Sequence, residues 1–128
     1  MPVIAALPPL ALVMIGGGIG AGLRFAVGRW SAATLGTGLP FATWGVNIVG
    51  GLAMGLLVGM LAGRDDGEPL RLLLGVGVLG GFTTFSAFSL EMVEMIVRGD
   101  VALAAAYAVS SVAGSIVALW AGALLVRA

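Results

Sequence analysis

One stretch of the chain gathers groups that could handle an ion: Gly80-Gly81-Phe82-Thr83-Thr84-Phe85-Ser86-Ala87-Phe88-Ser89. Two adjacent glycines followed by two β-branched threonines make a poor helix interior, so we predict that a helix breaks here. A break frees backbone carbonyls that can coordinate a cation, while hydroxyls and helix N-termini attract anions. The chemistry that these residues favour is ion coordination.

Phe85 and Phe88 are three residues apart, which places both rings on one face of a helix with Ser86 and Ser89 alongside. Two aromatic residues at this spacing are most often core packing. The alternative is that their electropositive ring edges replace part of the water around a small anion.

Asn47 lies in an apolar and glycine-rich stretch over residues 45–51. Inside a membrane its amide must find a partner or cost free energy. One interpretation is a hydrogen bond between helices, and the other is an N–H donor that faces an anion pathway. Tyr107 and Ser111 are four apart and bring two hydroxyls to one helix face, where by themselves they predict hydrogen bonding between helices.

Arg24 stands near the end of the first apolar stretch, where its guanidinium could snorkel to the membrane surface. Alternatively, it lines a watery vestibule that concentrates anions, or it caps carbonyls at a subunit interface. Glu91, Glu94 and Arg98 close the third apolar stretch, and the order of Glu94 and Arg98 favours an ion pair. We interpret these three as interfacial structure.

These residues are carried by four apolar windows: 10–29, 43–63, 72–97 and 101–125. Each is long enough to cross a membrane, which takes about 20 mostly apolar residues. The chain of 128 residues is 60% hydrophobic and 9% charged, whereas a soluble domain is roughly a quarter charged. We therefore predict an all-α membrane protein with one domain, residues 1–128, and loops at 31–42, 63–71 and 98–100.

Small residues recur every four positions on two windows: Gly51, Gly55, Gly59 and Gly63, and then Ser110, Gly114, Ala118 and Gly122. Such faces let helices approach closely in lipid, so we assign them to packing. The glycine run over residues 16–22 contains a dinucleotide-like GxGxxA match, but it lacks the preceding strand and the downstream acid. It also predicts helix packing.

The composition excludes several classes of function. The net charge is zero, with no lysine, histidine or cysteine, so nothing indicates a nucleic-acid partner, a zinc or haem site, or thiol catalysis. We expect that the protein is not an enzyme. The first basic side chain follows the first apolar window, so we expect this window to remain as a helix rather than to be cleaved as a signal peptide.

Orientation in a membrane normally follows the side that is richer in Lys and Arg, and here the sides tie. Three arginines flank one side and three the other: Arg64, Arg71 and Arg127 against Arg24, Arg29 and Arg98. A chain without this bias could insert both ways and pair as an antiparallel dimer.

Three motifs occur in order on the four windows: Gly20-Ala21-Gly22-Leu23-Arg24, Val46-Asn47 followed by glycines, and the stretch from Gly80 to Phe88. Together they resemble the Fluc (CrcB) fluoride channel family over essentially the whole chain. The resemblance implies a dual-topology antiparallel homodimer in the cell inner membrane. It also implies two pores that export fluoride passively and confer fluoride resistance, with a sodium ion at the centre of the dimer interface.

Carried over by matching position, the resemblance assigns the sodium ligands to the carbonyls of Gly80 and Thr83. It leaves Arg24 at a vestibule or an interface. Ala87 stands where the family usually has threonine, so one hydroxyl is missing there. The pore residues that it implies are Asn47, Thr84, Phe85, Ser86, Phe88, Tyr107 and Ser111.

Two other classes of membrane protein fit the sequence less well. A small four-helix multidrug exporter needs a carboxylate deep in the membrane. The first window has no acid, and Glu91 and Glu94 come late in the third. A non-catalytic accessory subunit fits the composition but leaves Asn47 and the residue 80–88 motif unexplained.

Overall fold

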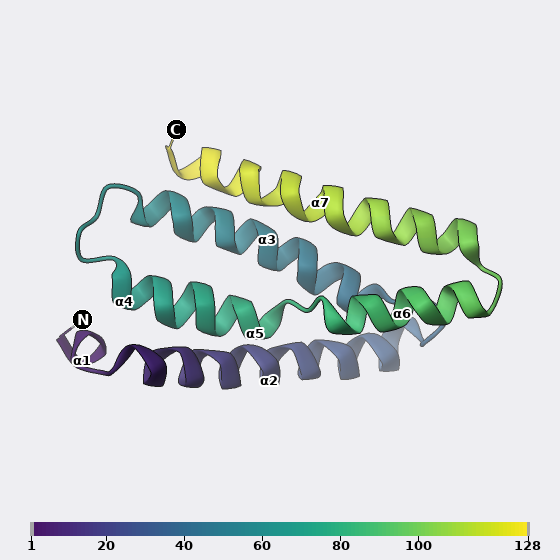
Figure 1. The fold of residues 1–128 in the computed structure, drawn as a ribbon, viewed down its shortest axis with the longest axis horizontal. Helices are drawn as coiled ribbons and strands as arrows, with labels where there is room; N and C mark the ends of the chain where they lie inside the picture. Colours follow the sequence, from purple (N-terminus) through teal and green to yellow (C-terminus); the bar gives the residue numbers. More distant parts are fainter. Residues whose placement is uncertain (1, 128) are drawn as a thin grey trace.

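A computed structural model describes residues 2–127, and no strand occurs among them (Figure 1). The helices pack as a bundle, and the third long helical stretch consists of the consecutive segments α4, η1, α5 and α6. The α3–α4 loop and both chain ends lie at one end of the bundle (Figure 1). The elements are α1 (Pro2–Ala5), α2 (Pro9–Leu35), α3 (Phe41–Leu61), α4 (Glu68–Leu70), the π-helix η1 (Arg71–Leu79), α5 (Gly80–Phe82), α6 (Ser86–Val97) and α7 (Val101–Arg127).

Four helical stretches are long and apolar enough to cross a membrane: Pro9–Leu35, Phe41–Leu61, Glu68–Val97 and Val101–Arg127. This confirms the predicted all-α membrane fold with four spanning segments. The first boundary was wrong, because α2 continues through residues 31–35, which were expected in a loop. Nothing in that serine- and alanine-containing stretch breaks a helix, and α2 ends only where Gly36 adopts a φ of 79°.

The glycine faces pack helices together, as predicted, and the structure places these contacts within one subunit. On α3, Gly51, Gly55 and Gly59 lie against α7, and a Cβ atom at Gly55 would overlap the carbonyl oxygen of Leu119. Gly63 does not join this face, since it follows α3 in a turn with a φ of 76°.

A second glycine contact joins α2 to η1. A Cβ atom at Gly16 would meet the Leu73 carbonyl, and one at Gly20 would meet the Val78 carbonyl. Four residues of α2 therefore span the same distance as five residues of η1. This mismatch is what a π-helix produces, since it fits one more residue into each turn than an α-helix.

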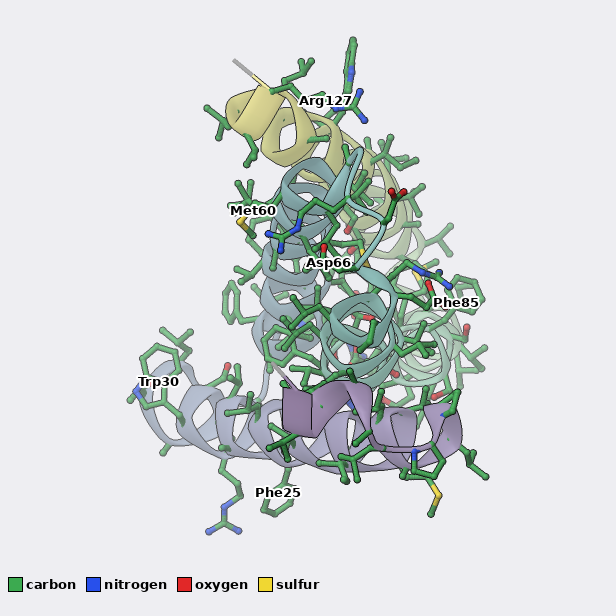
Figure 2. The ribbon with its side chains drawn as sticks, turned by 90° about the vertical axis from the view of Figure 1, so that its left-hand side faces the viewer. Phe25, Trp30, Met60, Asp66, Phe85 and Arg127 are labelled. Atoms are coloured by element: carbon green, nitrogen blue, oxygen red, sulfur yellow. The ribbon has the colours of Figure 1, made fainter. Side chains whose placement is uncertain are left out.

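Few side chains are buried, and large apolar ones point outward, including Phe25 and Trp30 (Figure 2). An outward apolar surface is what a hydrocarbon environment requires. Outside the helices, Arg64 pairs with Asp66, which lowers the pKa of that carboxyl by hydrogen bonding and charge.

The ion pair expected between Glu94 and Arg98 is replaced by one between Arg98 and Asp100, with Nε and Oδ2 3.4 Å apart. Gly99 has a φ of 88° at this turn, which folds the chain back after α6 and brings Asp100 to the arginine.

Candidate ion site around residues 80 to 88

The α5 helix ends at Phe82, and α6 begins at Ser86, so three residues link the two (Figure 1). Thr83 has an extended backbone, with φ −82° and ψ 158°. Its side-chain methyl group lies where a Cβ atom at Gly50 would stand, so α3 needs glycine there to seat this link.

Asn47 of α3 holds the link through two hydrogen bonds to one residue. Its Nδ2 donates to the Thr84 carbonyl at 3.0 Å, and its Oδ1 accepts from the Thr84 N–H at 2.8 Å. One of the two interpretations of Asn47 was a hydrogen bond to another helix, and the structure shows such a bond from α3 to the link of the third spanning segment. One N–H of the amide remains for another acceptor, because the group carries two.

Two backbone carbonyls lose the donors that a continuous α-helix would give them. Gly80 would accept from the N–H of Thr84, which instead donates to Asn47. Thr83 would accept from the N–H of Ala87, which instead donates to the Thr84 hydroxyl at 3.2 Å. Gly80 and Thr83 are the two residues to which the family resemblance assigned the sodium ligands, and a backbone oxygen that has lost its donor is of the kind that a hard cation binds.

A cavity of about 490 Å³ lies against this link, between α3, α5, α6 and α7. Among the residues that line it is Ser111, whose hydroxyl is buried and has no hydrogen-bond partner within residues 2–127. The sequence-predicted site residues that line the cavity are Asn47, Gly80, Thr83, Thr84, Phe85, Phe88 and Ser111.

Three aromatic rings continue from the cavity in a row. The ring centroids of Phe85 and Phe88 are 5.6 Å apart, and those of Phe88 and Tyr107 are 5.1 Å apart. Phe88 and Tyr107 are buried, whereas Phe85 is 76% exposed and projects from the subunit (Figure 2). Ser86 lies beside the row, with its hydroxyl 3.3 Å from that of Thr84.

The row ends at two residues that the sequence reasoning did not place in the site. Glu91 accepts hydrogen bonds from the Thr43 hydroxyl at 2.7 Å and from the Tyr107 hydroxyl at 2.5 Å. Glu91 was assigned to interfacial structure. A signal was present, because Glu91 follows Phe88 by three residues and Thr43 precedes Asn47 by four, which puts each on the face of a site residue.

Arg24 differs from its expected position. Because α2 extends to Leu35, Arg24 lies roughly 16 Å short of the helix end rather than in its last turns. Its Nε donates to the Gly81 carbonyl at 3.0 Å. Arg24 also lines a second cavity, of about 340 Å³, together with Arg29, Thr84 and Glu91.

These features define a multi-pass helical membrane protein in which one side-chain amide, hydroxyls and backbone carbonyls line part of an open, largely apolar cavity between the helices. Residues 11–123 match the family model described as "CrcB-like protein, Camphor Resistance (CrcB)". The chain belongs to the CrcB family.

The names of similar proteins agree with this assignment. The chain is 53% identical over 119 residues to "Fluoride-specific ion channel FluC" of Novosphingobium aromaticivorans. The aligned region covers 91% of this chain and 94% of the relative. It is 52% identical over 116 residues to the protein of the same name from Sphingopyxis alaskensis, covering 90% and 92%. These names describe channels and not enzymes, in keeping with the expectation from composition.

Proposed function

We propose that this protein is a fluoride-selective channel that exports cytoplasmic fluoride passively through the cell inner membrane and so confers fluoride resistance. The observation that carries the proposal is the Ser111 hydroxyl, a buried donor on the cavity wall without an acceptor among the described residues. A buried polar group without a partner is costly, so an anion that accepts its proton would be bound there. The names of the relatives support fluoride as that anion.

The other groups around the cavity suit the same ion. Fluoride is small, strongly hydrated and a strong hydrogen-bond acceptor, so its water must be replaced by closely placed donors. Asn47 retains one N–H, and the edges of Phe85 and Phe88 are electropositive. The chain contains no lysine that would hold the anion tightly, and permeation requires weak sites in series.

We further propose that the channel is an antiparallel homodimer with two pores. The arginines divide equally between the two halves of the bundle, with Arg64, Arg71 and Arg127 in the half that holds the α3–α4 loop and Arg24, Arg29 and Arg98 in the other, so charge gives neither orientation an advantage. Phe85 is exposed in a single subunit, and a partner would cover it and complete the cavity wall. A twofold axis then duplicates the site, giving one pore for each copy.

We also propose a sodium ion at the dimer interface, held by the Gly80 and Thr83 carbonyls and placed where the third helix is interrupted in the middle of the membrane. The diverted donors of Thr84 and Ala87 support these two oxygens as ligands. Backbone oxygens without donors are tolerated in the membrane only when another group satisfies them. A sodium ion would do so with its positive charge, and it would thereby hold the α5–α6 link of each subunit in place.

The experiment that tests the function is fluoride release from liposomes that contain the purified protein. Release of fluoride without release of chloride supports the proposal, and equal release of both ions contradicts it.

A further inference from the structure

Four carbonyls near the link between α5 and α6 fall into two kinds. Those of Gly81 and Thr84 accept hydrogen bonds from side chains of other helices, at 3.0 Å each. Those of Gly80 and Thr83 precede them by one residue each and have lost their α-helical donors. In both cases a side chain occupies the carbonyl next to a proposed sodium ligand.

Arg24 is the side chain that occupies the Gly81 carbonyl. It reaches this oxygen from the middle of α2 and is half-buried, at a depth where a cation needs a partner. A cation is favourable at this place because the carbonyl end of a helix carries partial negative charge. Gly81 is also packed tightly on α2, since a Cβ atom there would overlap the Gly17 carbonyl.

We propose that Arg24 is a positioning residue for the sodium site, an inference that rests on the proposed channel. By binding Gly81, Arg24 fixes the turn against α2 and leaves the neighbouring Gly80 carbonyl directed to the cation. Gly80 lines the first cavity, whereas Arg24 lines only the second, so the arginine acts on the ion through the backbone.

This role differs from anion recruitment in a way that can be measured. A recruiting arginine acts through its long-range field, so Arg29, which lines the same second cavity, would share the effect. A positioning arginine acts through the Nε hydrogen bond to one carbonyl. Lysine keeps the charge but lacks the rigid planar fork that sets this geometry.

The test is a sodium titration of the purified dimer after exchange into N-methylglucamine, with melting temperature as the first readout and fluoride release as the second. For Arg24→Met we expect the sodium concentration that gives half-maximal stabilisation to rise about tenfold, because a hydrogen bond from a charged donor is lost. Arg24→Lys should fall between this variant and the parent, and it serves if Arg24→Met does not fold. Arg29→Met, the matched control, should titrate like the parent.

An unchanged or lower half-maximal sodium concentration in both Arg24 variants would overturn the inference, even if fluoride release falls. So would an equal shift in Arg29→Met. If sodium does not stabilise the parent, the inference fails together with the sodium site, while fluoride release by the parent still tests the channel separately.

Discussion

Asn47 and Thr84 are joined by two hydrogen bonds, one in each direction, between a side-chain amide and the backbone N–H and C=O of one residue. A side chain that both donates to and accepts from one residue replaces the bonds that a helix would have made there. Asn47 thereby fixes the link between α5 and α6 and diverts the donor of the Gly80 carbonyl.

We expect Asn47→Asp to damage both the link and the pore. An ionised carboxylate still accepts from the Thr84 N–H, but its other oxygen repels the Thr84 carbonyl and repels fluoride. Fluoride release should fall at least about tenfold, which needs only about 1.4 kcal/mol of added barrier. The melting temperature should also drop, and this drop should shrink at acidic pH because a protonated carboxyl can donate as the amide does. Parent-like release from a dimeric Asn47→Asp protein would refute the role.

Ser111 and Ser110 make a matched pair on α7. Ser111→Ala removes a buried hydroxyl that has no partner, so stability should hold or increase while fluoride release falls. Ser110 accepts a hydrogen bond from the Trp44 indole and donates to the Tyr107 carbonyl, so Ser110→Ala should cost about 0.5–1.5 kcal/mol and leave release intact. Unfolding and fluoride release should be measured for both variants. If Ser111→Ala loses stability but releases fluoride like the parent, Ser111 does not lie on the pathway.

Phe85 and Phe88 differ in burial, so replacing them with isoleucine separates packing from conduction. Phe88→Ile should cost about 1–3 kcal/mol, because the ring is buried against Tyr107. Phe85→Ile should lower the free energy of unfolding of a single subunit only slightly, since the ring is exposed. If ring edges contact fluoride, both variants should still lose most of their release. Phe25→Ile, at an outward position on α2, is the control (Figure 2). A folded double variant that conducts like the parent would place the pore elsewhere.

The antiparallel dimer predicts that every loop occurs on both faces of the membrane. The chain has no cysteine, so Asp66→Cys in the α3–α4 loop and Thr37→Cys in the α2–α3 loop report single sites. An impermeant thiol reagent should label about half of each variant from outside intact vesicles and the rest after permeabilisation. In a protein with one orientation, the two variants would be labelled from opposite faces only.

The spanning helices and the family could be predicted because long apolar windows and the residue 80–88 motif are properties of the sequence itself. The glycine faces were also predicted, since close helix contact in lipid needs small residues at regular spacing. The partners of polar residues were harder to predict. The partners of Asn47 are the backbone N–H and C=O of a residue 37 positions away, and no residue type indicates them.

Arg24 and Glu91 show the same limit. Arg24 was predicted near the membrane surface because the sequence does not show that α2 continues to Leu35. The contact between Thr43 and Glu91 depends on how the helices pack, which the sequence does not show either. The π-helix was not foreseen either, because its extra residue is visible only in the contacts between η1 and α2. The roles assigned to the pore residues and the sodium ligands remain predictions.

The most direct test of the central proposal compares two ions in one preparation of purified protein, reconstituted at low density in liposomes loaded with fluoride or with chloride. Valinomycin with potassium supplies the balancing current, so release reports passive flux and needs no pH gradient. A selective pore of uncharged donors predicts rapid fluoride release and chloride release no faster than from protein-free liposomes. Comparable release of the two ions, or none of either from folded dimeric protein, would contradict it.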